Sequence, residues 1–255
     1  MQWRELAAGY VQTIKPIPLD MASKERIVSL IDLTSLNATD NEADIAALCE
    51  RATQLVSPVA AICIYPRFVK LVADTFAGTS VKTATVANFP GGDQSLENVL
   101  IEINAALQDG AEEIDVVFPY ERYLAGERQH AQNFISTCKT ACGVSAILKV
   151  ILETGALKDP AIIADAAFDA IAAGADFVKT STGKLPEGAT LEAAAVLLLV
   201  IKHVSTSLQH PVGLKISGGI RTLEQAAEYI ELADVIMGRD WVSPETFRIG
   251  ASKIV

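Results

Sequence analysis

The chain has 255 residues, of which half are hydrophobic, and its 31 acidic residues outnumber its 21 lysines and arginines, giving a formal net charge of -10. This acidic balance argues against a general nucleic-acid binder, because nucleic-acid backbones are held by clustered lysine and arginine. No uninterrupted apolar stretch approaches the ~18 residues needed to span a bilayer, and no basic-plus-apolar signal opens the chain. We therefore expect a compact enzyme with no membrane and no nucleic-acid partner.

Short β-branched runs alternate along the chain with longer alanine- and leucine-rich stretches of helical periodicity. Residues 1–22 are expected to form an N-terminal extension, with a short helix covering the bottom of the domain formed by residues 23–255. The expected strands are 28–33, 59–64, 82–87, 113–118, 146–152, 175–180, 211–216 and 233–237. The expected helices are 41–55, 66–77, 95–109, 127–142, 157–173, 189–206 and 222–231.

This alternation predicts parallel strands joined by crossover helices. Eight such units in ~250 residues are typical of an α/β fold of one domain, the (β/α)8 TIM barrel. A doubly wound open sheet is the competing architecture. It normally carries a G-x-G-x-x-G turn after its first strand, and this sequence has none there.

The cysteines and histidines give little sign of a metal or a disulfide framework. Cys49, Cys63, Cys138 and Cys142 form no C-x-x-C pair, so we expect reduced, packed thiols and a cytoplasmic protein. His130, His203 and His210 are scattered and stand in no H-x-x-x-H or H-x-E context. We therefore expect no metal site.

Charged residues interrupt five of the apolar runs. These residues are Asp32, Asp115, Lys149, Lys179 and Lys215. A single charge of this kind is more often a structural ion pair than a catalytic group. Five of them in strands whose carboxyl ends meet at one barrel mouth favour a catalytic site, where the charges must pair to offset the cost of burial.

Two of the lysines stand beside glycine-containing turns. Burial at the end of 175–179 disfavours the charged form of Lys179 and makes it a candidate nucleophile toward carbonyls. Lys215 occupies a similar position, and Gly218-Gly219 follows it as a flexible turn suited to a phosphate. Gly250-Ala251-Ser252 is expected to begin a small extra helix whose N-terminus binds the same anion.

Two other motifs near these positions are set aside. Thr182-Gly183-Lys184 resembles the end of a P-loop, but Val178 stands where that motif needs glycine and Leu185 replaces its serine or threonine. Cys63 lies beside the expected mouth, but no histidine accompanies it to activate a nucleophilic thiol. Cys63 and Thr182 are therefore expected to be supporting residues.

Four segments resemble deoxyribose-phosphate aldolases, and the similarity extends from about Ile27 to Ser252. They are Ala61–Phe68, Glu113–Tyr120, Leu148–Gly155 and Phe177–Gly183. The resemblance implies a class I aldolase that reversibly splits 2-deoxy-D-ribose 5-phosphate into D-glyceraldehyde 3-phosphate and acetaldehyde, with no metal or cofactor. It also implies that Lys179 forms the Schiff base, Lys215 is its partner lysine, and Asp115 transfers protons.

The residue chemistry agrees with this implication. An iminium on Lys179 accepts electrons from a breaking carbon–carbon bond better than a free aldehyde does. Asp32 and Lys149 are expected to hold the charged groups in place. Backbone amides near Gly183, Gly218, Gly219 and Ser252 are expected to bind the phosphate, which lets an acidic protein hold an anion.

The carboxyl terminus departs from the family pattern. Members commonly continue through a final helix to a tail whose terminal tyrosine assists proton transfer, whereas this sequence stops at Val255. We expect either another proton relay or a longer natural chain. Lys253 stands where members often have a second serine, and it is expected to add positive charge to the phosphate site.

Two rival functions stay open. A transaldolase-like or ketose-phosphate aldolase also uses a lysine imine, and a catalytically weak barrel that merely binds a sugar phosphate is the alternative from another class. The expected partners are small molecules, a sugar phosphate and acetaldehyde. The residues do not fix the oligomeric state, and a homodimer is one candidate.

Overall fold

Eight parallel strands close into a barrel in the computed structural model, which describes residues 2–15, 18–208, 211–252 and 254. Each strand pairs with its neighbours in chain order, and the last strand pairs with the first. The strands are β1 Ile31–Ser35, β2 Ala61–Ile64, β3 Lys82–Ala87, β4 Glu113–Val117, β5 Ile147–Ile151, β6 Phe177–Lys179, β7 Gly213–Ser217 and β8 Phe247–Ala251. The predicted single (β/α)8 barrel is confirmed.

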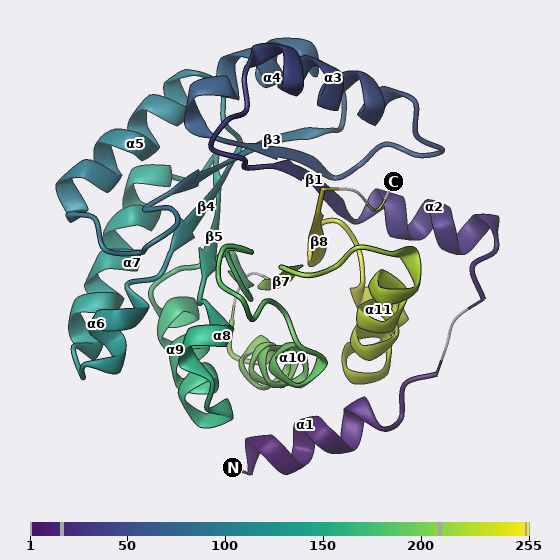
Figure 1. The fold of residues 1–255 in the computed structure, drawn as a ribbon. Helices are drawn as coiled ribbons and strands as arrows, with labels where there is room; N and C mark the ends of the chain where they lie inside the picture. Colours follow the sequence, from purple (N-terminus) through teal and green to yellow (C-terminus); the bar gives the residue numbers. More distant parts are fainter. Residues whose placement is uncertain (1, 16–17, 209–210, 253, 255) are drawn as a thin grey trace.

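Helices surround the barrel as an outer layer (Figure 1). The α-helices are α1 Trp3–Val11, α2 Met21–Ser29, α3 Glu42–Thr53, α4 Val69–Thr75, α5 Leu96–Gln108, α6 Tyr120–Leu124, α7 Arg128–Cys142, α8 Thr154–Leu157, α9 Pro160–Ala172, α10 Leu191–Ser205 and α11 Leu223–Met237. Two short 3-10 helices are η1 Pro66–Phe68 and η2 Arg239–Trp241. Side-chain caps fix several helix starts: Asn41 accepts from the backbone N–H groups of Ala43 and Asp44, and Thr190 and Thr222 cap α10 and α11.

The apolar core has two parts. The larger part lies between the strands and the surrounding helices, and α10 buries eight residues there. The smaller part lies on the inner side of β2 and β3 and consists of Leu36, Ala61, Cys63, Ala84 and Val86. Successive strand residues point to opposite faces, so the same strands supply both parts.

The predicted eighth strand, 233–237, is wrong. These residues form the end of α11, where Leu232, Ala233 and Ile236 are buried at helical spacing. The true strand, β8, lies 14 residues farther along the chain at Phe247–Ala251. A short apolar run cannot be assigned to strand or helix by its hydrophobicity alone, and here the run continues a helix. The predicted helix 222–231 accordingly extends to Met237.

The beginning of the barrel also differs from the prediction. Val28 and Ser29 belong to α2 rather than to the first strand, and the boundary expected between residues 22 and 23 falls inside this helix. On α2, Arg26 pairs through two hydrogen bonds of 2.6 Å with Asp234 of α11. The helix therefore belongs to the outer layer.

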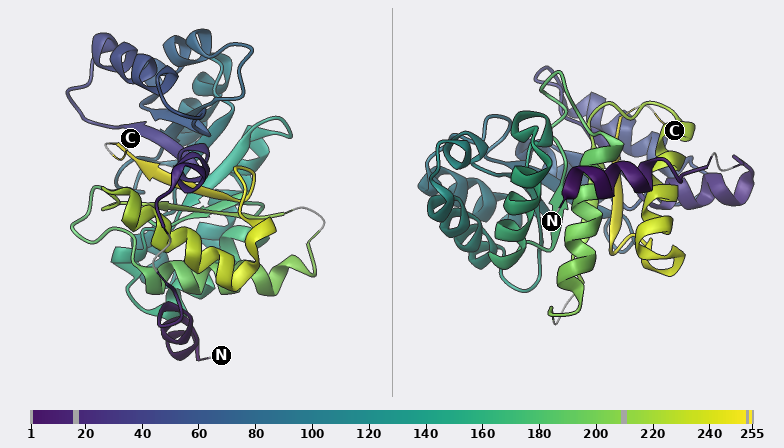
Figure 2. Two further views of the ribbon diagram at one scale, coloured as in Figure 1. Left: turned by 90° about the vertical axis from the view of Figure 1, so that its right-hand side faces the viewer. Right: turned by 90° about the horizontal axis from the view of Figure 1, so that it is seen from below.

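Helix α1 does not cover the bottom of the barrel as expected. It crosses the outer side of α10 (Figures 1 and 2). Its buried residues are Trp3 and Ala7, and the Trp3 ring lies 6.1 Å from that of Phe168 in α9. The amphipathic segment thus adds a layer to the helices instead of closing the barrel.

The helix expected to begin at Gly250 is likewise absent from the described residues. Gly250 and Ala251 complete β8, and Ser252 follows the strand directly. Any phosphate site near Ser252 therefore involves a strand end and not a helix N-terminus. Lys253 lies outside the described residues.

Candidate active site

Asp115 brings three lysines together inside the barrel. Its carboxylate oxygen Oδ1 lies 2.7 Å from Lys149 Nζ, and Oδ2 lies 2.7 Å from both Lys179 Nζ and Lys215 Nζ. The strand register explains the meeting, because Asp115 pairs with Lys149 across β4 and β5, and Lys179 pairs with Lys215 across β6 and β7. All four side chains are buried.

A second set of ion pairs lies behind the first. Asp32 Oδ2 is 2.5 Å from Lys215 Nζ, and Glu113 Oε2 is 2.7 Å from Lys149 Nζ. Arg248 joins the two carboxylates, with Nη1 2.7 Å from Asp32 Oδ1 and Nη2 2.8 Å from Glu113 Oε1. We call this whole set the barrel charge cluster; its members are Asp32, Glu113, Asp115, Lys149, Lys179, Lys215 and Arg248.

Sequence reasoning missed two members of the cluster. Glu113 precedes Asp115 by two residues, so both point to the same face of β4, and this period-two spacing was a usable signal. Arg248 lies in β8, whereas the sequence pattern predicts the eighth strand at 233–237. The prediction therefore does not place Arg248 in the barrel interior. Asp32, Asp115, Lys149, Lys179 and Lys215 all lie in the cluster, as the sequence suggested.

The cluster is electrically balanced when Lys179 is neutral. Three carboxylates then face the three cations Lys149, Lys215 and Arg248. A fourth buried positive charge would have no carboxylate of its own, and an uncompensated charge in the interior is costly. Charge balance therefore favours one neutral lysine, and Lys179 is the one with a single carboxylate partner, whereas Lys149 and Lys215 each contact two or more.

The direction of each pKa shift agrees with this balance. Desolvation lowers the pKa of Lys179, and the positive charge of Lys215 lowers it further, although Asp115 opposes both. Burial also acts to lower the pKa of Lys215, but Asp115 and Asp32 hold it well above its usual value. Burial would raise the pKa of Asp115, yet its three lysines hold it well below the usual range. Lys215 is thus an ammonium and Asp115 a carboxylate.

A cavity of about 810 Å³ opens above the cluster. Of the cluster members, all of which belong to the described chain, Lys179 alone lines it. The expected phosphate-site residues Gly183, Gly218, Gly219 and Ser252 line it too, as does Thr182. Three cations absent from the sequence prediction also border it, namely Arg51, Lys184 and Arg221. The cavity therefore brings an amine together with glycines and three cations, and Asp40 and Asp44 also line it.

Two consecutive glycines shape one wall of the cavity. Gly218 and Gly219 have φ angles of +91° and +89°, which only glycine adopts readily. A side chain on Gly188 would lie 2.4 Å from the Gly218 carbonyl oxygen, so the loop after β6 passes close to the turn after β7. The turn exposes backbone to the cavity where a phosphate could approach closely.

Glu153, which the sequence reasoning did not single out, fixes the loop that carries Thr182. It is 1% exposed and adopts a left-handed conformation with φ +58°, and its carboxyl group accepts from Thr182 N at 3.2 Å and Thr182 Oγ1 at 2.5 Å. Burial raises the pKa of Glu153. Thr182 Oγ1 in turn accepts from the Lys184 N–H at 3.1 Å, so this contact also orders the next residues of the cavity wall.

Cys63 lies under the cavity and does not line it. It is fully buried, and burial raises the pKa of its thiol. It therefore packs as a small apolar group beside the cluster. Cys49, Cys138 and Cys142 are likewise buried free thiols.

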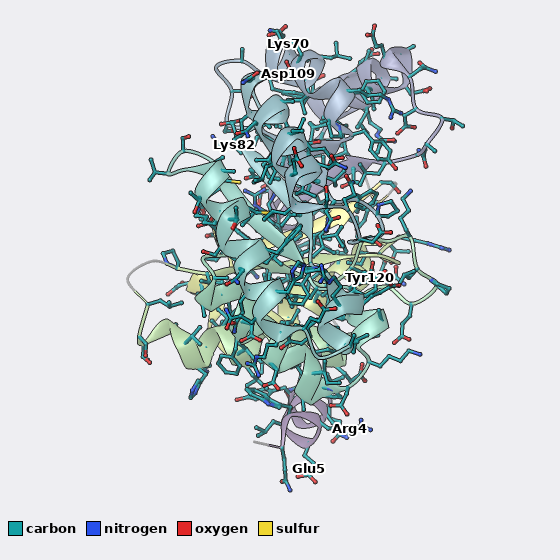
Figure 3. The ribbon with its side chains drawn as sticks, turned by 90° about the vertical axis from the view of Figure 1, so that its left-hand side faces the viewer. Arg4, Glu5, Lys70, Lys82, Asp109 and Tyr120 are labelled. Atoms are coloured by element: carbon teal, nitrogen blue, oxygen red, sulfur yellow. The ribbon has the colours of Figure 1, made fainter. Side chains whose placement is uncertain are left out.

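The site lies at the carboxyl ends of the strands. Gly218 and Gly219 follow β7 and Ser252 follows β8, so the cavity is lined by residues at these strand ends. Figure 3 labels Tyr120, just after β4, and Lys82, which begins β3. Working groups of such barrels occupy this face. A family model describing DeoC/LacD family aldolases matches residues 26–243.

The chain belongs to the DeoC/LacD family of aldolases. It is therefore an enzyme of the lyase class. Among solved structures, it resembles a candidate deoxyribose-phosphate aldolase from Coccidioides immitis at 30% identity and a TM-score of 0.79, covering 98% of this chain and 93% of the other.

Two further aldolase structures are similar to this family member. An aldolase called QR15 is 30% identical with a TM-score of 0.74, over 88% of this chain and 90% of that one. The deoxyribose-phosphate aldolase of Aeropyrum pernix, described as a unique tetramer, is 26% identical with a TM-score of 0.74, over 98% and 93% of the two chains.

None of the helices in the described ranges is long and apolar enough to span a membrane. Those ranges also contain no grouping of three or more histidine, cysteine, aspartate or glutamate side chains arranged to hold a metal ion.

Proposed function

We propose that this family member is a class I aldolase that reversibly cleaves 2-deoxy-D-ribose 5-phosphate into D-glyceraldehyde 3-phosphate and acetaldehyde through a Schiff base on Lys179. One observation carries the proposal: Lys179 is the cluster lysine that reaches the cavity, and the cluster is balanced when that amine is neutral. A neutral amine is what attack on a carbonyl requires.

The chemistry follows from the positions of the amine and its neighbours. Lys179 Nζ attacks the aldehyde carbon of the open-chain sugar, and loss of water from the carbinolamine gives an iminium. Removal of the proton from the C3 hydroxyl then breaks the C2–C3 bond, and its electron pair moves toward the iminium nitrogen to give an enamine. Glyceraldehyde 3-phosphate leaves, a proton adds to the terminal enamine carbon, and hydrolysis releases acetaldehyde and the free amine.

Asp115 is the proposed proton-transfer residue. Its Oδ2 atom lies 2.7 Å from Lys179 Nζ and from Lys215 Nζ, so one oxygen contacts both the reacting amine and a fixed ammonium. A proton released at the carbinolamine can move to this oxygen, directly or through a water molecule. Lys215, Asp32 and Lys149 keep the carboxylate oriented and charged.

The phosphate group is proposed to bind at Gly183, Gly218, Gly219 and Ser252. The left-handed turn at Gly218 and Gly219 supports this assignment, because it lets a phosphate approach the backbone closely. Lys184 and Arg221 add positive charge on the same wall of the cavity. Phosphate recognition thus depends on local cations in a protein that is acidic as a whole.

A direct assay tests the proposal. The purified chain is given 2-deoxy-D-ribose 5-phosphate, and both products are measured with and without a chelator. We expect glyceraldehyde 3-phosphate and acetaldehyde in equal amounts and unchanged rates with the chelator. Cleavage of a ketose phosphate with no acetaldehyde would favour a transaldolase-like or ketose-phosphate aldolase, and binding without products would indicate a sugar-phosphate binder.

A further inference from the structure

Arg248 and Glu113 occupy the part of the barrel charge cluster farthest from the cavity. Their guanidinium and carboxylate groups are 2.8 Å apart, and both side chains are buried. Within the described residues neither side chain lines the cavity, and the ion pair of Lys179 is with Asp115 instead. Arg248 also lies beyond residues 26–243, the part of the chain that the family model matches. A role in contacting substrate is therefore excluded for both side chains.

Two chains of ion pairs nevertheless connect them to the reacting amine. Arg248 contacts Asp32, which holds Lys215 beside Asp115. Glu113 contacts Lys149, which lies 2.7 Å from the other oxygen of Asp115. Both chains end at the carboxylate that touches Lys179. A change of charge at either remote position is thus transmitted within a continuous buried network.

We propose that Arg248 and Glu113 are positioning residues that set the protonation state of Lys179 by fixing the charge balance of the cluster. Arg248 supplies the third cation, which allows Lys179 to be neutral. Glu113 supplies the third carboxylate, which keeps Lys149 and Lys215 charged. This inference rests on the proposed function of Lys179 as the Schiff-base lysine.

Titratable groups from several strands surround Lys179. Asp115, Lys215 and Cys63 act on it directly. The remaining cluster members, which act through them, are Asp32 from β1, Glu113 from β4, Lys149 from β5 and Arg248 from β8. The buried residues 83–87 of β3 are uncharged, and the raised pKa of Cys63 keeps that thiol neutral. Glu153, which follows β5, is also coupled electrostatically to Lys179, and burial raises its pKa, which favours its uncharged form.

Removing the positive charge of Arg248 and removing the negative charge of Glu113 should shift the pKa of Lys179 in opposite directions. In Arg248→Gln one carboxylate loses its counter-charge, and protonation of Lys179 restores neutrality. In Glu113→Gln one cation is left over, so Lys179 loses its proton more readily. Strands β6 and β8 are two apart, about 10 Å at the usual strand spacing, and a unit charge at that distance shifts a pKa by about one unit. Below its pKa, imine formation should slow about tenfold in the first variant.

The decisive experiment compares these variants with the double variant Glu113→Gln/Arg248→Gln. The pH dependence of imine formation with acetaldehyde is measured together with an NMR titration of the Lys179 side-chain nitrogen. We expect the titration midpoint to rise by about one unit in Arg248→Gln, fall by a similar amount in Glu113→Gln, and return to the wild-type value in the double variant, where two carboxylates face two cations. Arg248→Lys should keep the wild-type midpoint.

Matched controls remove ion pairs outside the cluster. Glu112→Gln breaks the exposed pair with Lys82, one residue from Glu113, and Arg26→Gln breaks the bidentate pair with Asp234. Neither should move the midpoint. Shifts of the same sign in both cluster variants, no shift in a folded one, or no return in the double variant would overturn the proposal. If one of the two single variants does not fold, the titration midpoints of the other single variant and of the double variant test the proposal.

A failure of the proposed function would be detected by a different measurement from a failure of this inference. A wild-type enzyme that forms no reducible adduct on Lys179 would refute the Schiff-base assignment, while the NMR titration would still report whether Arg248 and Glu113 govern the charge of that amine. The two inferences therefore fail through separate measurements.

Discussion

The two sides of the barrel interior differ in what they do for the protein. On the β2–β3 side, small apolar residues such as Ala61, Ala84 and Val86 pack closely and contribute stability through burial. On the side formed by β1 and β4–β8, seven buried charged groups occupy the same kind of position. Buried ion pairs contribute little net stability, because desolvation offsets much of their attraction. Six of the eight strands thus contribute buried charges to one network that reaches the cavity at Lys179, and two contribute apolar packing.

Loss of the amine itself should have the largest effect. Lys179→Ala is expected to abolish imine trapping and to reduce cleavage by at least about 10³-fold, because the electron sink is lost. Lys184→Met is the matched control, since it removes a lysine from the same cavity but not from the cluster. It should keep the adduct and weaken substrate binding. Equal loss of the adduct in both variants would contradict a special role for Lys179.

Lys215→Leu should affect both stability and pH dependence. The substitution leaves Asp32 and Asp115 without a shared cation, so we expect the free energy of unfolding to fall by about 3–5 kcal/mol. It also removes a positive neighbour of Lys179, and the pKa of that amine should rise by about one unit, or about 1.4 kcal/mol. Imine formation should then require a higher pH than in the wild type. An unchanged profile in a folded variant would show that the two lysines are not coupled.

A cavity-creating substitution on the β2–β3 side should lower the stability of the protein without changing imine formation at Lys179. Val86→Ala removes buried methyl groups and is expected to lower the free energy of unfolding by about 2 kcal/mol. The cluster charges remain, so the pH profile of imine formation should match that of the wild type. Denaturant unfolding and the pH profile measured on one preparation check both points. A shifted pH profile would mean that packing on β3 also affects the pKa of Lys179.

The smallest effect is expected at the glycine wall. Gly219 and Gly238 have similar φ angles, +89° and +94°, and a methyl group on either would meet no atom within 4 Å. Alanine at either position should therefore cost about 1–3 kcal/mol of backbone strain. Only Gly219 lines the cavity, so only Gly219→Ala should raise the KM for the phosphorylated substrate. An equal KM in both variants would argue against phosphate binding at this turn.

The sequence reveals β4 to β7 and their charged residues because a lysine or aspartate inside an apolar run is itself unusual. Asp115, Lys149, Lys179 and Lys215 could therefore be selected without a structure. Arg248 could not, because the segment around it is short and polar at its start, while residues 233–237 offered a more apolar competitor. The burial of Arg248 depends on Asp32 and Glu113, which are distant in sequence.

Glu153 shows a second limit of sequence reasoning. Its role depends on a left-handed backbone and on contact with a loop 29 residues away. Neither feature has a local sequence pattern. Glycine turns are easier to recognise, yet the sequence predicts a helix start at Gly250, because the pairing of Gly250 with Asp32 across β8 and β1 is a tertiary property.

The most direct test of the account is to trap the imine. The enzyme is mixed with acetaldehyde, reduced with borohydride and digested, and the modified peptide is identified by mass spectrometry. Because Lys179 combines access to the cavity with a lowered pKa, we predict one N-ethyl group on Lys179 and none on Lys149, Lys184 or Lys215. An adduct on one of those three lysines instead, or no adduct at all, would contradict the central claim.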